Sequence, residues 1–422
     1  MGLPAVAVIV DGCRSGGLFP SAFKEKGIQC VNIQSCNPIP PVFREGFRPE
    51  SFIENIIFQK DAAALAKSLI EKYEVLCVIP GAEIGVEVSD QISEALSVLS
   101  NGTARSRARR DKYEMALALQ EAGLPTPKFC KLSSWDELVR WKTQEQVDYP
   151  IVLKPLNSCG TDGVFICQNE TELYTALHQL VGSTNLLSEI NCQILAQSFL
   201  AGEEYLINSV SRDGQLFVTA ILHGKKKRIE GHGDIYVHEK ILKSTGPIQD
   251  ALVAMHRKVA AALEIQHGPL HAEYKFTEQG PVLIEIAARV SGGTHPTNAE
   301  STGFEQVKLV VDAYTDPTKF KAQTINPYLR SKYFYEMFLN APNDGTITGK
   351  AAFESAIKRL ESYRDHSFKL NDGDYVPKTL DLVSSICTVF LVHEDKCKIQ
   401  SDYVKITQLA NKLIAPLSIR AA

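Results

Sequence analysis

The sequence predicts a mixed α/β fold that begins with an open parallel sheet, and three observations support this prediction. Short apolar runs alternate with helix-like periodicity over about the first 100 residues. A lysine lies in a strand-like run just before a loop of small residues, in YPIVLKPLNSCGTDGVFIC (149–167). Two glutamates, Glu273 and Glu285, lie in apolar runs joined by one turn, in LHAEYKFTEQGPVLIEIAARVSGG (270–293). Strands alternating with helices are typical of a parallel sheet covered by helices.

Composition argues against several classes of protein. The chain has 422 residues, of which 44% are hydrophobic and 22% charged, and its formal net charge is −4. This length predicts about two to four domains, and the lack of a strongly basic segment argues against a nucleic-acid partner. No apolar run approaches the roughly 18 residues of a membrane helix. The ten cysteines form no CxxC pair, which argues against structural zinc and disulfides and favours a cytoplasmic enzyme with reduced thiols.

The first 105 residues are expected to form an N-terminal domain. AVAVIV (5–10) is typical of a strand buried on both faces, and it lacks the basic residues that precede the apolar part of a signal peptide. The elements that follow are expected to be a helix at 18–27, a strand at 28–33, a helix at 61–73, a strand and loop at 75–83 and a helix at 89–99.

The rest of the chain mixes both periodicities. We expect helices at 111–122, 170–180, 249–264, 351–361 and 403–413, and strands in 151–167, 193–224, 270–276, 281–287, 333–338 and 386–393. The segment KKKRIEGHGDIYVHE (225–239) is charged and contains glycine, so it predicts a mobile loop.

Lys154 is a candidate phosphate ligand. Backbone N–H groups approach phosphate oxygens closely only where side chains are small, and lysine adds a compact positive charge. The loop 157–163 and Lys154 provide both. In a P-loop the lysine follows the glycines and opens a helix, whereas here it precedes them and the chain returns as a strand. The alternative is an ordinary glycine-rich turn beside an unrelated lysine.

Glu273 and Glu285 are candidate metal ligands. In adjacent antiparallel strands they can lie side by side, where unpaired carboxylates are costly to bury. A Mg²⁺ ion would offset that cost, with phosphates as further ligands. The alternatives are a solvated sheet face or salt bridges to Arg289 and Lys275. Arg289 is also a candidate for neutralising charge on a transferred phosphoryl group.

Taken together, three segments resemble the ATP-grasp carboxylate–amine ligases, and the likeness extends from residue 5 to about residue 330. RDKYEMALALQEAGLPTPKF (110–129) is similar to the segment that carries the family's first phosphate-binding lysine, which implies that role for Lys112. PIVLKPLNSCGTDGV (150–164) is similar to the segment of the second lysine and of the loop that closes over the phosphates. QSFLAGEEYLINSV (197–210) resembles the hinge beside adenine and ribose.

The resemblance implies ATP and one or two Mg²⁺ ions, for which Mn²⁺ can substitute. The implied ATP-binding residues are Lys112, Lys154, Ser158, Gly160, Thr161, Gly163, Gln197, Phe199, Leu200 and Glu204. Glu273 and Glu285 match the metal-binding carboxylates. The family usually has glutamate at Gln197 and asparagine at Ala287, so a second metal would have one protein ligand fewer here.

The implied reaction is amide or peptide bond formation through an acyl phosphate, with release of ADP and phosphate. Arg289 and Lys154 are the predicted catalytic residues. EIAARVSGGTHP (285–296) fits the amino-acid and dipeptide ligases of the bacilysin-synthetase type, so an amino acid and a second amine are the expected substrates. Candidate substrate-binding residues are Glu83, His232, His295 and Asn298; a lobe-packing salt bridge explains Glu83 equally well.

Two other functions stay open at this point. One is a carbamoyl-phosphate- or biotin-carboxylase-like carboxylating enzyme, and the other is a non-catalytic ATP-binding regulator. The resemblance also leaves a homodimer open. The predicted parts are a Rossmann-like domain (1–105), a small ATP-grasp lobe (106–205), a large ATP-grasp lobe (206–325) and a C-terminal α/β subdomain (326–422).

Overall fold

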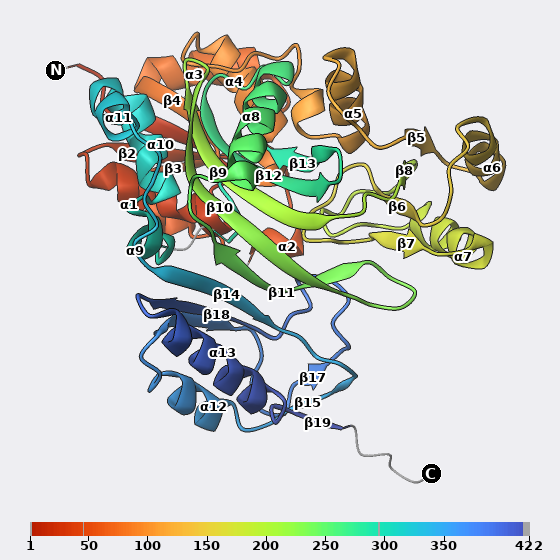
Figure 1. The fold of residues 1–422 in the computed structure, drawn as a ribbon. Coiled ribbons are helices and arrows are strands. Elements are labelled where there is room, and N and C mark those ends of the chain that lie inside the picture. Colours follow the sequence, from red (N-terminus) through yellow and green to blue (C-terminus); the bar gives the residue numbers. More distant parts are fainter. Residues whose placement is uncertain (1, 45, 294–295, 417–422) are drawn as a thin grey trace.

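The computed structural model of the chain describes residues 2–44, 46–293 and 296–416 (Figure 1). Three sheets dominate it. In Figure 1 the N-terminal sheet lies at the upper left, a small sheet lies at the right, and a long curved sheet passes through the centre to the C-terminal strands below. Among the described residues, no helix combines the length and the apolar character needed to cross a membrane.

The N-terminal sheet is parallel, as predicted, with the strand order β3-β2-β1-β4. Its strands are β1 (Ala5–Val10), β2 (Gln29–Gln34), β3 (Glu54–Ile57) and β4 (Glu74–Pro80). The associated helices are α1 (Phe19–Lys24), α2 (Pro41–Arg44), α3 (Ala62–Lys72) and α4 (Val86–Ala95). Strand β1 is buried from Val6 to Val10 because apolar clusters pack on both of its faces.

A second, antiparallel sheet carries the predicted phosphate hairpin. Its strand order is β5-β8-β6-β7, from β5 (Phe129–Leu132), β6 (Ile151–Pro155), β7 (Phe165–Cys167) and β8 (Ile194–Ser198). Helices α6 (Trp135–Gln144) and α7 (Glu170–Leu180) pack on it through one apolar cluster that includes Trp141. The loop between β6 and β7 is therefore held at the edge of a small, separately packed lobe.

The central sheet has eight strands in the order β13-β12-β9-β10-β11-β14-β18-β16. They are β9 (Glu203–Arg212), β10 (Gln215–Arg228), β11 (Asp234–Ile241), β12 (Gly268–Thr277), β13 (Gly280–Ala287), β14 (Tyr333–Leu339), β16 (Tyr363–Phe368) and β18 (Cys387–His393). The prediction of a mobile loop at 225–239 is wrong, because most of this segment belongs to β10 and β11. Its charged side chains alternate between the two faces of the hairpin, as side chains do in a strand. The high lysine content made this alternation hard to recognise in the sequence.

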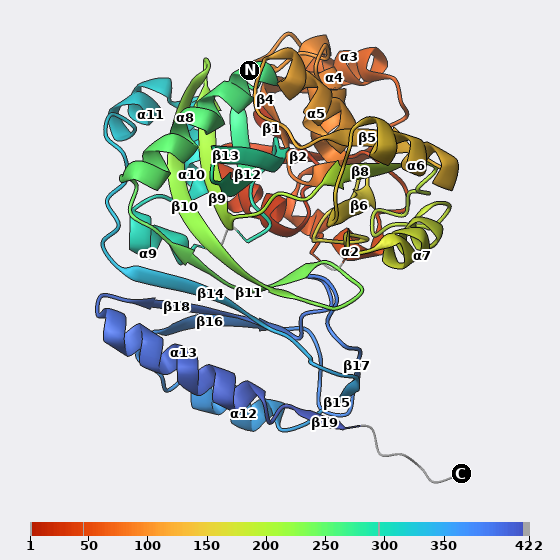
Figure 2. The same cartoon turned by 45° about the vertical axis from the view of Figure 1, so that its right-hand side comes forward.

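The C-terminal residues extend this sheet. Strand β14 pairs with β11, so hydrogen bonding continues across the predicted boundary at 325/326. Helices α12 (Lys350–Ile357) and α13 (Lys396–Ala410) belong to the same C-terminal layer, and both views place them on the outer side of β14 and β18 (Figures 1 and 2). A short sheet joins β15 (Gly345–Ile347), β17 (Tyr375–Val376) and β19 (Ile414–Pro416).

Five further helices connect these layers: α5 (Lys112–Glu121), α8 (Pro247–Ala262), α9 (Asn298–Thr302), α10 (Gln306–Thr315) and α11 (Pro317–Gln323). Helices α9, α10 and α11 were not predicted from the sequence. Helix α10 is apolar on most sides because its valines share one core with β1 and with β9. This core joins the N-terminal sheet to the central sheet.

A buried ion pair fixes the start of α5. The Arg109 side chain is fully buried and donates to Asp90 on α4 over 3.0 and 3.1 Å and to the Leu263 carbonyl over 2.9 Å. Asp111 then caps α5 by accepting from the N–H groups of Tyr113 and Glu114. Because Lys112 is the first residue of this helix, these contacts position its side chain.

We expect Arg109→Met to lower the free energy of unfolding by about 3–5 kcal/mol, because Asp90 would stay buried without its cation. Urea denaturation followed by circular dichroism measures this. Arg105→Met is the matched control: Arg105 is about one-third exposed and pairs with the exposed Glu121, so its loss should cost less than about 1 kcal/mol. Equal losses in the two variants would show that the Arg109 pair does not anchor the helix.

Candidate active site

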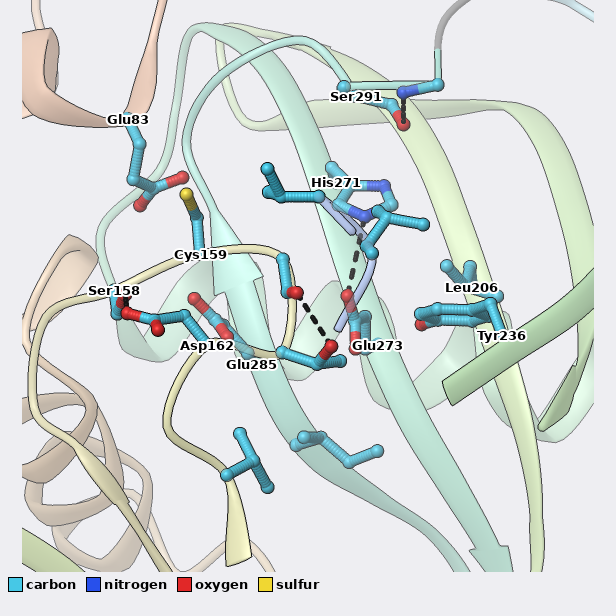
Figure 3. A pocket seen from close by; sticks show the side chains of 18 of the residues that line it. Glu83, Ser158, Cys159, Asp162, Leu206, Tyr236, His271, Glu273, Glu285 and Ser291 are labelled. Carbon is cyan, nitrogen blue, oxygen red and sulfur yellow. Dashed lines mark hydrogen bonds and ion pairs between the residues drawn. The ribbon is translucent and has the colours of Figure 1, made fainter. Parts of the chain in front are cut away.

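The predicted site residues converge on one cavity of about 470 Å³. Residues from the N-terminal loops, the phosphate hairpin, the central sheet and the C-terminal strands all line it. Figure 3 shows carboxylates from these parts facing the same space, with Glu83 on one side and Glu273 and Glu285 on the other. The predicted residues that line it are Glu83, Lys112, Lys154, Ser158, Gly160, Thr161, Gln197, Phe199, Leu200, Glu204, Glu273, Glu285 and Arg289.

The two predicted phosphate lysines are both buried against this cavity. Lys112 Nζ lies 3.0 Å from a Glu285 oxygen and donates to the Ser158 carbonyl over 3.1 Å. Lys154, on β6, has no hydrogen bond or ion pair to any residue that the structure describes. Burial and the charge of Lys112 lower the pKa of Lys154 to about 8, although Glu285 and Glu273 partly oppose this shift. An unpaired buried ammonium of this kind would be stabilised by an anion.

The loop after Lys154 is ordered by its own polar side chains. Ser158 Oγ donates to Asp162 over 2.6 Å, and the same carboxylate accepts from the Leu186 N–H over 2.9 Å. Gly160 has φ +65°, a left-handed conformation that favours glycine. Gly163 is not among the cavity-lining residues: a Cβ there would lie about 3.0 Å from Pro155 and Leu180, so close packing explains this glycine.

Glu273 and Glu285 are directly opposed in the register of β12 and β13. The expected side-by-side placement is therefore present. Burial opposes ionisation of Glu273, but His271, whose Nε2 lies 3.7 Å from its carboxylate, and the charge of Lys226 outweigh it and hold its pKa at about 2. Two opposed carboxylates in a polar cavity are a donor set that fits Mg²⁺. Among the described residues, no group of three or more acidic, histidine or cysteine side chains could hold a metal alone, so phosphates or water would complete the coordination.

The hinge residues border the far end of the cavity. Gln197 lies on β8, and Phe199 and Leu200 follow it. Glu204 is buried and already engaged: the Tyr236 hydroxyl donates to it over 2.8 Å, and Lys226 and Lys275 lie 2.6 and 3.4 Å away. A ribose hydroxyl would share or displace one of these partners.

Glu83 forms the lobe-packing salt bridge that the sequence analysis offered as its alternative role. Its carboxylate accepts from Arg289 Nε over 2.8 Å and lies 3.6 Å from Arg110. Although burial raises the pKa of Glu83, the two guanidinium groups outweigh it, and the net shift is downward. Arg289 is thus tied to the N-terminal domain while it lines the cavity.

Neither His232 nor Asn298, which were also predicted to bind substrate, lines the cavity. His232 lies at the tip of the β10–β11 hairpin and packs against the Phe165 ring instead of lining the cavity. Asn298, at the start of α9, is buried outside the lining, and its Oδ1 atom has no hydrogen-bond partner among the described residues. His295 lies outside the described residues.

Several cavity residues were not predicted individually: Lys226, Tyr236, Glu239, Glu336 and Lys369. A β-bulge lets both Tyr236 and Glu239 face the cavity although they are three residues apart, since the register with β10 shifts there. Glu336 was detectable in principle, as a charged residue that alternates with phenylalanines in YFYEMFL (333–339).

Comparison with known proteins agrees with this geometry. Residues 147–298, which span the predicted phosphate hairpin, the predicted hinge and both candidate metal ligands, match the ATP-grasp domain family. Over this segment the chain is therefore similar to ATP-grasp proteins. The prediction of an ATP-grasp fold is therefore confirmed.

Two relatives of this chain are named as a synthase and a ligase. It is 28% identical over 419 residues to dapdiamide A synthase of Enterobacter agglomerans, covering 95% of each chain. It is 22% identical over 294 residues to an L-arginine-specific L-amino acid ligase of Bacillus subtilis, covering 69% of this chain and 68% of that one. These relatives support the prediction of an enzyme that forms C–N bonds with ATP.

The fold likeness covers nearly the whole chain. The crystal structure of an L-amino acid ligase from Bacillus licheniformis superposes with a TM-score of 0.74 at 18% identity, covering 96% of this chain and 97% of that one. A carboxyaminoimidazole ribonucleotide synthase from Aspergillus clavatus, complexed with ATP, gives a TM-score of 0.70 at 14% identity, covering 97% and 99%. At these identities the likeness concerns the fold.

The depressed pKa of Lys154 predicts a pH dependence of ATP affinity. Below pH 8 the Lys154 ammonium is already charged, so the affinity for ATP should not depend on pH. Above pH 8 binding requires proton uptake, and affinity should fall by up to about tenfold per pH unit. In Lys154→Arg the guanidinium stays charged, so this fall should disappear. Calorimetric titration from pH 7 to 9.5 measures both, and an identical fall in the two proteins would refute the assignment.

Proposed function

We propose that the chain uses ATP to activate the carboxylate of an amino acid and joins it to the amine of a second amino acid. The observation that carries this proposal is the convergence of Lys112, Lys154, Glu273 and Glu285 on one cavity from four separate elements. Two relatives bear the names of a synthase and an amino acid ligase, which supports the same reaction class.

Each charged group has a proposed task. Lys112 and Lys154 bind the phosphates, and the 157–163 loop lies over them. Glu273 and Glu285 hold Mg²⁺, which neutralises phosphate charge when bound. Arg289, held by Glu83, stabilises charge on the phosphoryl group and on the acyl phosphate.

Amide bond formation from the acyl phosphate requires correct positioning of the amine and exclusion of water more than it requires a nucleophilic side chain. An acyl phosphate is already a strong electrophile, so the protein has to orient the amine and exclude water. The cavity is lined by sheet, hinge and C-terminal strands on several sides, which suits that task. Cys13 and Cys159 also line it, but burial raises the pKa of both thiols, which disfavours the reactive thiolate.

Product analysis tests this function directly. After incubation with ATP, Mg²⁺ and mixed amino acids, mass spectrometry should detect peptide-bonded products, with ADP and phosphate released only when amino acids are present. ADP release that depends on bicarbonate would instead favour the carboxylating alternative. Tight ATP binding without turnover under all conditions would favour the regulator.

Glu285→Gln should reduce turnover by roughly two orders of magnitude or more, the scale of losing one charged group from a catalytic site. Glutamine keeps the volume but is a poor Mg²⁺ ligand, so the fold should persist. Glu278→Gln, in the exposed turn of the same hairpin, is the control and should behave as wild type. If Glu285→Gln kept the turnover of wild type, Glu285 would not be a Mg²⁺ ligand.

A further inference from the structure

Two carboxylates in the cavity have no task in the reaction described above. Glu239 on β11 and Glu336 on β14 are directly opposed in the register of the central sheet. Both line the cavity, and Phe390 on β18 continues the same cross-strand row. The row therefore leads from the nucleotide side of the cavity towards its C-terminal side.

Glu336 is buried and has no partner among the residues that the structure describes. Only 4% of its surface is exposed, and no hydrogen bond or ion pair joins its carboxylate to any residue that the structure describes. Glu239 likewise has no such partner within the described residues. Burial of an uncompensated carboxylate is unfavourable. Burial and the neighbouring Glu239 raise the pKa of Glu336 well above its usual value, which is the response of a site lacking its cation.

The nearby cations are engaged elsewhere. Lys226 pairs with Glu204 over 2.6 Å, and Lys275 also lies against Glu204. Lys369 donates to the Val383 carbonyl over 2.8 Å. Among the described residues, no cation is therefore paired with Glu239 or Glu336, which leaves them available to a cationic ligand.

The missing side chain of Gly293 leaves space for such a group. A Cβ on Gly293 would lie 3.0 and 3.2 Å from the two Glu336 oxygens, so any larger residue would press on the carboxylate. Gly293 follows Arg289 by four residues, in the turn that leaves the metal-site strand β13. Phe338, two residues from Glu336, and Phe390, opposite Glu336 in the register, also line the cavity. Their aromatic rings suit an organic cation better than a hydrated metal ion.

We propose that Glu336, together with Glu239, binds the primary ammonium group of the amino acid whose carboxylate is activated, and that Gly293 keeps this subsite open. The inference deepens the proposed function and rests on it. Arg289 and the phosphate lysines would face the carboxylate end of the substrate, and the acidic pair its ammonium end. A zwitterion would then be oriented by charge at both ends.

The test compares free amino acids with their N-acetyl derivatives as carboxylate substrates in an ADP-release assay. Wild type should reject the N-acetyl forms. Glu336→Gln should raise the KM for the free amino acid at least about 30-fold, on the scale of a lost charge-assisted contact. The variant should also prefer the free amino acid over its N-acetyl form less strongly than wild type does. Gly293→Ala should raise the same KM. Glu394→Gln, at an exposed position after β18, is the control.

Nucleotide affinity shows whether a variant is folded, and it should stay within about twofold of wild type in Glu336→Gln. An unchanged KM and an unchanged preference in a variant that binds nucleotide would overturn the subsite.

If wild type forms no peptide from any amino acid, the proposed function fails. Calorimetry with free and N-acetylated amino acids, in the presence of a non-hydrolysable ATP analogue, then decides the subsite separately. Binding of the free forms that Glu336→Gln abolishes supports it. Equal binding of free and N-acetylated forms rejects it.

Discussion

The contact between Lys112 and Glu285 is the constraint on which the site depends. It is a 3.0 Å ion pair between the first residue of α5 and a strand of the central sheet, and the same ammonium donates to the Ser158 carbonyl in the loop after β6. One side chain thereby ties together three parts of the chain that are distant in sequence. The Arg109–Asp90 pair behind it fixes the position from which Lys112 reaches.

Charge is distributed unevenly around the cavity. Most of its ions are paired: Glu83 with Arg289, Glu204 with Lys226, and Glu285 with Lys112. The groups without partners among the described residues are a cation, Lys154, on the phosphate side and two carboxylates, Glu239 and Glu336, on the C-terminal side. Such polarity suits a ligand set that is anionic at one end and cationic at the other, as ATP and an amino acid are together.

The local sequence pattern was sufficient to predict the strands and turns that contain the main motifs. Because one turn joins β12 and β13, the opposition of Glu273 and Glu285 followed from counting residues. Lys154 and its loop were predictable because a strand, small residues and a returning strand are adjacent in sequence. The roles of Lys112 and of the hinge came from family resemblance, since nothing local to them specifies a nucleotide.

Features that depend on long-range contacts could not be predicted in this way. The bulge in β11 breaks the simple alternation that would have placed Glu239. The 225–239 segment was misassigned because charged residues on a hairpin beside a cavity resemble those of a solvated loop. Glu336 joins the site only because β14 pairs with β11, a contact between residues about 100 apart in sequence.

The central claim is that two lysines and two glutamates surround a single triphosphate. A crystal structure with a non-hydrolysable ATP analogue and Mn²⁺, located by anomalous scattering, tests it most directly. The account predicts metal density between Glu273 and Glu285, with the phosphates in contact with Lys112 and Lys154. Nucleotide bound elsewhere, or metal that touches neither glutamate, would contradict it.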